Sequence, residues 1–384
     1  MNPLAVQLCS ALKRKPTSRA ERRNVVFHRA QDYRDCLKQL SAEGVRPLKK
    51  VDSMRMICCR GDQSADWKQL SRHPRIALVE RDRKVKAHGL GRIAAPRISA
   101  VVKSRIPWNV SRVKAPPAWP ASGFGATIKV GILDTGIARH PDLAIAGGVN
   151  TITGKSFADD NGHGTHVAGI VAAMGRRKIY GVAPKVELYA VKVLDANGSG
   201  FISDIIEGID WCLSRGIRIM NMSFGLTGES ALLRKAIRHA RRRGAVIVAS
   251  AGNSGTALPQ IDAPARYPET IAVAATTRAN RAASFSSRGK GIDIAAPGVS
   301  ILSTWLNGTY RRESGTSMSA PHVTGAAALL RGVRPHLGAA EVARKLKKAA
   351  LKIPGGKNAV GFGLVQIEPA NSLNDLLLRP RMPI

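Results

Sequence analysis

The order of apolar segments after residue 127 most constrains the fold of this chain. Short runs rich in Val, Ile and Ala alternate with longer amphipathic segments, as expected for strands that alternate with helices. Strands of this kind form parallel sheets with helices on both faces. We therefore expect an α/β fold with three layers. The predicted strands are 128–133, 186–193, 217–222, 245–250 and 270–275, and the predicted covering helices are 204–215, 229–243, 319–330 and 339–348.

One serine stands where a nucleophile would be favoured. Residues 315–322 (GTSMSAPH) place Ser317 between a glycine turn and an apolar helix. The start of a helix has unpaired N–H groups and a partial positive charge, and both favour attack by a serine on a carbonyl group. A lone serine at such a position is more often a helix cap. The catalytic interpretation therefore depends on partners elsewhere in the chain.

Two further segments supply those partners. Residues 128–136 (IKVGILDTG) form an apolar strand that ends in Asp134, and residues 161–173 (NGHGTHVAGIVAA) place His163 before a helix of small residues. Catalytic groups of open α/β sheets lie at such strand ends. A histidine can take the proton of a serine when a carboxylate orients its ring. Asp134, His163 and Ser317 are therefore the candidate catalytic residues.

These three motifs, in the order Asp, His, Ser, resemble those of the subtilisin-like serine proteases, the subtilase family. The resemblance covers residues 23 to about 371. It implies a subtilisin-like catalytic domain and a serine endopeptidase that hydrolyses protein or peptide substrates through an acyl-enzyme, with no cofactor required. An aspartic protease would need a second Asp-Thr-Gly motif, and a zinc protease would need a Glu beside His163.

The resemblance also assigns residues around the nucleophile. Asn253 follows the apolar strand 245–250 and is similar to the family's oxyanion asparagine, with the Ser317 backbone N–H as the second donor. A protease presents an extended peptide to its nucleophile, and an exposed strand supplies backbone pairing for that peptide. Residues 219–225 (IMNMSFG) resemble the substrate-pairing strand, which points to the substrate-binding residues Ser223, Phe224 and Gly225.

Asp262 is the candidate specificity residue. Counted back from residues 267–273 (YPETIAV), it falls near the position where the family often has a small residue at the floor of the pocket for P1, the substrate residue that precedes the cleaved bond. A carboxylate there would pair with Lys or Arg. The alternative is a solvated aspartate in a loop.

Residues 23–88 predict a separate small domain. Strands at 24–28, 54–59 and 76–80, with helices at 32–43 and 64–73, predict an α+β, ferredoxin-like sheet. This domain resembles the family's propeptide, which assists folding and then blocks the active site as an intramolecular inhibitor; the alternative is a binding module that stays attached. The remaining predicted parts are an N-terminal extension (1–22), a flexible basic linker (89–105) and the peptidase domain (106–384), with self-processing between residues 84 and 105.

The formal charge of +34 is unusually high. Such a charge promotes non-specific binding to anionic surfaces. Its densest cluster, residues 238–243 (RHARRR), also fits a solvated helix end, where cations meet the helix dipole favourably, and no nucleic-acid-binding signature accompanies it. The alternative function is therefore a basic binding protein on an inactive or latent protease scaffold.

The sequence argues against stabilisation of the mature enzyme by disulfides and by calcium at one loop. Only Cys212, of five cysteines, follows the predicted processing segment, which excludes a disulfide framework in the mature enzyme. Many relatives bind structural calcium in a loop after the histidine helix. Here that loop, residues 174–180 (MGRRKIY), is short and cationic, so we expect this calcium site to be lost although Asp142 remains at a position resembling a ligand. We assign no metal ligands.

The sequence gives weak indications of location. Its apolar stretches are too short to span a bilayer, and residues 3–12 lack the preceding positive charge of a typical signal peptide. The family resemblance favours a secreted or cell-envelope enzyme, with the cytoplasm as the alternative. We expect a monomer.

Overall fold

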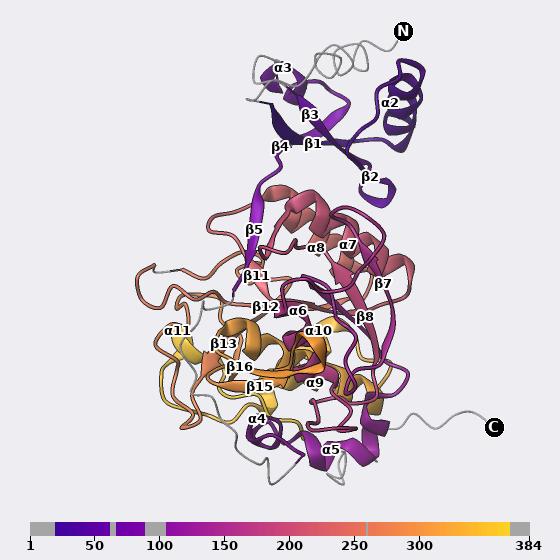
Figure 1. The fold of residues 1–384 in the computed structure, drawn as a ribbon. Coiled ribbons are helices and arrows are strands. Elements are labelled where there is room, and N and C mark those ends of the chain that lie inside the picture. Colours follow the sequence, from indigo (N-terminus) through magenta and orange to yellow (C-terminus); the bar gives the residue numbers. More distant parts are fainter. Residues whose placement is uncertain (1–19, 62–66, 89–104, 259, 369–384) are drawn as a thin grey trace, which may run out of the picture.

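The computed structural model describes residues 20–61, 67–88, 105–258 and 260–368. A small N-terminal domain lies on helices α7 and α8 of a larger domain (Figure 1). Most of the predicted N-terminal extension and linker, together with Cys9, lie outside the described residues. The free thiols of Cys36, Cys58, Cys59 and Cys212 are buried.

A seven-stranded sheet forms the middle layer of the larger domain. Its strand order is β14-β13-β12-β10-β6-β8-β7, and every neighbouring pair is parallel. The five predicted strands are present, and two edge strands, β7 and β14, were not predicted. The bounds are β6 Lys129–Asp134, β7 Ile145–Asn150, β8 Glu187–Lys192, β10 Ile219–Met222, β12 Val246–Ser250, β13 Ile271–Thr276 and β14 Ile294–Pro297.

Helices cover both faces of this sheet. Helices α6, α9 and α10 share one apolar core with it, and α7 and α8 share the other. The three-layer α/β prediction is confirmed. The helix bounds are α4 Trp108–Arg112, α5 Ala115–Ser122, α6 His163–Ala172, α7 Ile202–Ser214, α8 Ala231–Arg242, α9 Thr316–Val333, α10 Ala339–Ala349 and α11 Lys357–Val360.

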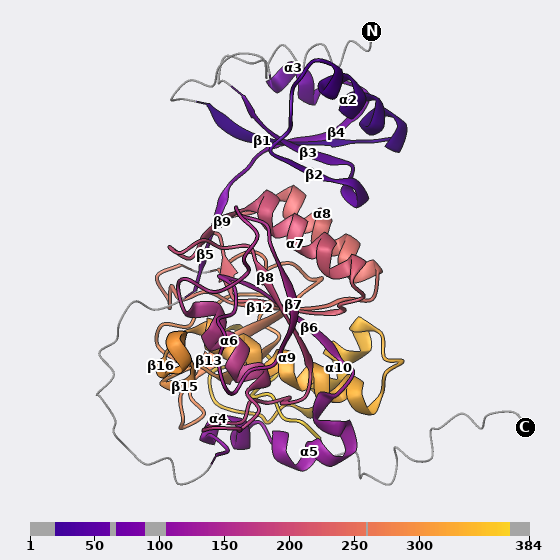
Figure 2. The same ribbon diagram turned by 45° about the vertical axis from the view of Figure 1, so that its right-hand side comes forward.

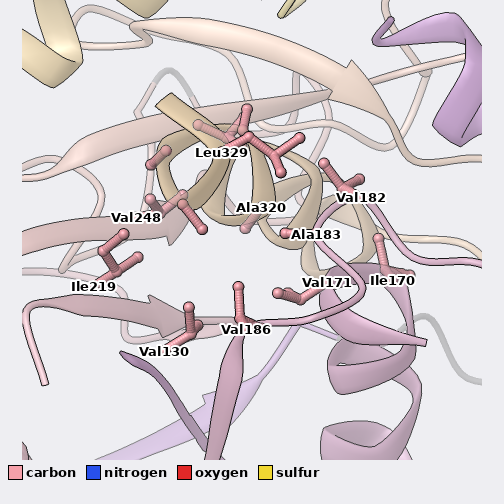
Figure 3. Close-up of a cluster of buried hydrophobic side chains, with 14 of the residues drawn as sticks. Val130, Ile170, Val171, Val182, Ala183, Val186, Ile219, Val248, Ala320 and Leu329 are labelled. Atoms are coloured by element: carbon pink, nitrogen blue, oxygen red, sulfur yellow. The ribbon is translucent and has the colours of Figure 1, made fainter. Parts of the chain in front are cut away.

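Alternating side chains of the strands enter the two cores. Val246 and Val248 of β12 face the α9 side, whereas Ile247 and Ala249 face the α7 and α8 side. Figure 3 shows Val248 with Leu329 and other apolar side chains between α9 and the sheet. This period of two, apolar on both faces, is why a fully buried parallel strand reads as a continuous apolar run.

The N-terminal domain is a four-stranded antiparallel sheet of order β2-β3-β1-β4. Its βαββαβ chain order confirms the ferredoxin-like prediction. Helices α2 and α3 pack on one face of the sheet, and the other face packs on α7 and α8 through apolar side chains such as Val26 and Met56 (Figure 2). The bounds are β1 Glu21–Phe27, α2 Ala30–Ala42, β2 Lys49–Val51, β3 Met56–Gly61, α3 Trp67–Ser71 and β4 Ile76–Arg81.

The chain that leaves the N-terminal domain forms one more strand, β5 (Lys84–Ala87), which enters the larger domain (Figure 1). It lies between β9 (Ser199–Phe201) and β11 (Phe224–Gly225) and pairs antiparallel with both. The sequence had not predicted this strand, because it has only four residues, lies beside a basic stretch taken as linker, and pairs with partners that are distant in sequence. A smaller hairpin joins β15 (Ile301–Thr304) to β16 (Tyr310–Glu313). No helix in the described part of the chain has the length and apolar character needed to cross a bilayer.

Candidate active site

Asp134 and His163 form a buried pair. Asp134 ends β6, His163 begins α6, and His163 Nδ1 lies 2.7 Å from Asp134 Oδ1. The same oxygen accepts the Thr135 backbone amide at 2.8 Å. A carboxylate that only accepts keeps a proton on Nδ1, so the lone pair of Nε2 is free to take another proton.

The helix that carries His163 begins on a second buried carboxylate, Asp159. Its oxygens accept hydrogen bonds of 2.6 to 2.9 Å from the amides of Asn161, Gly162 and Thr165 and from the hydroxyls of Thr135 and Thr165. These bonds satisfy amides at the start of α6 and tie the helix to the residue that follows Asp134. Asp159 was not recognised from the sequence, although an aspartate just before a helix is a capping signal.

The pKa of His163 is raised above its ordinary value. Burial acts to lower it, but the charge and hydrogen bond of Asp134 raise it, with smaller contributions from the charges of Asp159 and Glu313. The ring is therefore a stronger base than an exposed histidine, as suits a group that accepts a proton.

Ser317 lies in the first turn of α9, just after Gly315. Its hydroxyl donates to the carbonyl oxygen of Ser223 at 2.9 Å. Among the described residues, His163 Nε2 has no hydrogen-bond partner. The expected serine–histidine hydrogen bond is thus absent from this part of the structure. Catalytic hydrogen bonds of this kind often align only in the reacting complex, and a turn about the Cα–Cβ bond redirects a serine hydroxyl.

Residues 84–88 of the same chain pair with the site as an added strand. Phe224 pairs with Ala87 and Gly225 with Lys86, and the His88 amide donates to the Ser223 carbonyl at 3.1 Å. Ser223, Phe224 and Gly225, which were named from the sequence, therefore border an extended backbone. This is the pairing that strand addition requires of a bound peptide.

The carbonyl oxygen of His88 accepts a hydrogen bond from Asn253 Nδ2 at 2.5 Å. Asn253 Oδ1 accepts the Thr316 amide at 3.0 Å, and because a backbone amide can only donate, this bond fixes which end of the side chain faces His88. A Cβ atom at Gly315 would lie 2.7 Å from the same carbonyl oxygen, so the approach needs glycine there. The arrangement is that of a donor aimed at a reacting carbonyl.

The second expected donor, the Ser317 amide, makes no hydrogen bond to the His88 oxygen in the described residues. An oxyanion hole is built for the position of the oxygen in the tetrahedral intermediate, which differs from that of a planar carbonyl.

The ring of His88 lies between two polar side chains. Its Nδ1 is 2.7 Å from Ser250 Oγ, and its Nε2 is 3.0 Å from Asp262 Oδ2. Asp262, the candidate specificity residue, thus contacts the side chain of His88, the residue whose carbonyl oxygen accepts from Asn253. Neither His88 nor Ser250 was recognised from the sequence, because a serine that ends an apolar strand looks like an ordinary core residue.

Hydrogen bonds from one loop and one tyrosine hold the carboxylate of Asp142. Its carboxylate accepts the Tyr310 hydroxyl at 2.7 Å and three backbone amides at 2.6 to 3.1 Å, those of Arg177, Lys178 and Ile179. Burial acts to raise its pKa, but these hydrogen bonds together lower it. Donors therefore surround the carboxylate where a cation would need free oxygens. No group of three or more His, Cys, Asp or Glu in the described ranges could hold a metal ion.

Comparison with known proteins agrees with this geometry. Residues 125–363 match the subtilase family. The alkaline protease of Alkalihalobacillus alcalophilus is 43% identical over 307 residues, which cover 79% of this chain and 76% of the relative. Subtilisin Savinase of Lederbergia lenta is 46% identical over 267 residues, which cover 69% of this chain and 98% of the relative. The chain therefore belongs to the subtilase family and is a serine endopeptidase of the subtilisin type.

Proposed function

We propose that Ser317, His163 and Asp134 carry out peptide hydrolysis in this enzyme. Ser317 Oγ attacks the substrate carbonyl, and His163 Nε2 takes the serine proton and then gives it to the leaving amine. Water activated by the same histidine hydrolyses the acyl-enzyme. Asp134 orients the ring and stabilises its protonated form. The 2.7 Å contact between Asp134 and His163 and the place of Ser317 at the start of α9 support these roles.

Negative charge on the substrate oxygen would be stabilised by Asn253, with the Ser317 amide as the second donor. The side-chain amide of Asn253 is held by Thr316 and already faces a peptide carbonyl. A donor fixed before the reaction does not have to reorganise when the charge develops.

The hydrogen bond between Asn253 and the His88 carbonyl also supports the proposal that the chain is a self-processing zymogen. Asn253 donates to the carbonyl of His88, and the preceding residues pair with β9 and β11 in the manner of a substrate. The bond that follows His88 is therefore the one offered to Ser317. We propose that it is cut in the enzyme's own chain, which places the cleavage within the range 84–105 expected from the sequence.

The N-terminal domain would act as the intramolecular inhibitor. Apart from strand β5, it contacts α7 and α8 through carboxylates at the helix starts, where Asp82 accepts from Ser203 and Glu80 accepts from Leu232. Apolar contacts such as those of Val26 and Met56 accompany them. Because these contacts lie away from the bond to be cut, the domain would hold its position after cleavage.

We further propose a preference for basic P1 residues, since Asp262 supplies a negative charge at the P1 side chain. The enzyme would not need structural calcium at the loop 174–180, where the amides of that loop bind Asp142 instead. Release outside the cytoplasm and a monomeric state stay predictions.

The test compares the full chain with its Ser317→Ala variant, expressed identically, by intact mass and N-terminal sequencing. We expect only the unaltered chain to be cut, with Gly89 as the first residue of the larger product. Identical cleavage of both proteins would assign the cut to another protease. An uncut but folded wild-type chain would contradict self-processing, and a different new terminus would contradict the assignment of His88.

A further inference from the structure

Two polar side chains, those of Ser250 and Asp262, have the His88 ring as their shared partner. Within the described ranges, the buried Ser250 hydroxyl hydrogen-bonds only to His88 Nδ1, and the Asp262 side chain forms an ion pair only with His88. The nearby Arg266 directs its Nε to the Ile261 carbonyl at 3.0 Å. With His88 in place the Ser250 hydroxyl is fully buried, so a side chain without a polar atom at this position would leave the hydroxyl buried and unpaired.

The two groups suit the two ring nitrogens differently. A hydroxyl both donates and accepts, so Ser250 can serve Nδ1 whether or not that nitrogen carries a proton. Asp262 Oδ2 lies 3.0 Å from Nε2 without an aligned hydrogen bond, so its carboxylate would attract a positively charged substrate side chain at this position. Asp262 thus favours a P1 side chain with a positive charge, and Ser250 favours one with a nitrogen close to the backbone.

The backbone of Gly225 lies close to the His88 ring, and that of Gly252 lies close to Asp262. A Cβ atom at Gly225 would lie 2.5 Å from His88 Cε1 and Nε2, and one at Gly252 would lie 2.7 Å from Asp262 Oδ2. The ring therefore lies directly against main chain, with the carboxylate at its outer nitrogen. Lysine and arginine carry their charge farther from the backbone and present methylene groups to Ser250, whereas phenylalanine leaves both polar groups without a partner.

Resting on the proposed function, we propose that Ser250 and Asp262 together select histidine as the P1 residue of this enzyme's substrates. The pair narrows a general preference for basic side chains to imidazole. His88 is then both the last residue of the inhibitory segment and an example of the preferred substrate.

The test uses the self-processed enzyme and peptide p-nitroanilides of sequence Val-Lys-Ala-X, which copy residues 85–87 with X as His, Lys, Arg, Phe or Leu. We expect kcat/KM for His to exceed that for the others by about ten- to a hundredfold, the range for a hydrogen bond to a charged group. Ser250→Ala should lower kcat/KM for His and leave Lys and Arg unchanged. Asp262→Asn should lower all three basic substrates.

Two controls separate recognition from damage to the fold. Ser214→Ala makes the same change at the exposed end of α7, where the hydroxyl bonds only to Trp211 of its own helix, and should alter none of the rates. Full-chain His88→Lys and His88→Phe leave the catalytic domain intact and should be processed more slowly than the unaltered chain.

The possible negative results distinguish failure of the histidine preference from failure of the proposed function. Equal or faster hydrolysis with Lys or Arg would overturn the histidine preference and leave the protease proposal intact. The same holds if Ser250→Ala lowers all five substrates equally. If the folded, processed protein hydrolyses none of the peptides, the proposed function fails and the histidine preference fails with it.

Discussion

Asp82 of the N-terminal domain accepts hydrogen bonds from the backbone amide and the hydroxyl of Ser203, at 2.9 and 2.8 Å. Ser203 lies in the first turn of α7. Glu80 accepts the Leu232 amide of α8 at 3.2 Å in the same way. Two carboxylates of one domain therefore lie at the positive ends of two helices of the other, which gives the interface an electrostatic anchor independent of the active site.

Asp82→Ala should weaken this anchor. The change removes the helix contact and leaves Arg22, whose Nε is 2.8 Å from Asp82, without that partner. In the uncleaved Ser317→Ala chain we expect the free energy of unfolding to fall by about 1 to 3 kcal/mol, measured by urea titration. Asp35→Ala, at a half-buried site in α2 where the carboxylate bonds to Gln31 of its own helix, is the control and should change it by less than about 0.5 kcal/mol. Equal losses in the two variants would contradict the anchor.

Asn253→Ala should act on the chemical step. We expect kcat to fall by about a hundred- to a thousandfold with little change in KM, which is the loss known for removing such a donor from a subtilisin. Steady-state kinetics of the processed enzyme measure both values. Asn358→Ala, an exposed change in α11, should leave them unaltered. A raised KM at constant kcat would show that Asn253 serves ground-state binding instead.

The fold could be predicted where side-chain pattern and final environment agree. Strands β6, β10 and β12 are buried on both faces, so their apolar runs were visible in the sequence. Edge strand β7 (IAGGVN) has two glycines and mostly half-buried positions, and strand β14 (IAAP) has only four residues. Neither gives a clear strand signal.

In the site, the catalytic residues could be predicted from the sequence, whereas the contacts of His88 could not. Asp134, His163 and Ser317 stand in short motifs at the ends of predictable elements, so their chemistry could be inferred before their positions were known. The partnership of His88 with Ser250 and Asp262 joins residues that are more than 150 positions apart. Nothing local marks such a contact, because it exists only once β5 has paired with β9 and β11.

Asp142 gives a prediction about calcium. Because loop amides and Tyr310 surround its carboxylate, any change that calcium or a chelator makes to the melting temperature of the processed enzyme should be the same in the Asp142→Ala variant. Asp142→Ala should lower the free energy of unfolding by about 2 to 4 kcal/mol, and Tyr310→Phe by about 1 kcal/mol. The pKa of Asp142 is lowered on folding, so this stabilisation is present at neutral pH and is lost as the pH falls through that lowered pKa. A rise in melting temperature with calcium that disappears in Asp142→Ala would show that Asp142 binds the ion and would contradict the prediction.

The charge of Glu313 should influence the pH at which kcat/KM falls on the acid side. His163 must be neutral to accept a proton, and its pKa is raised, so kcat/KM should fall with decreasing pH from a midpoint above the ordinary histidine value of about 6.5. Glu313→Gln removes one of the charges that raise this pKa and should move the midpoint to lower pH. Glu341→Gln, at the exposed start of α10, retains an oxygen for its bond to the Gly338 amide and should leave the midpoint in place. A midpoint that moves upward, or moves equally in both variants, would show that the charge of Glu313 does not act on His163.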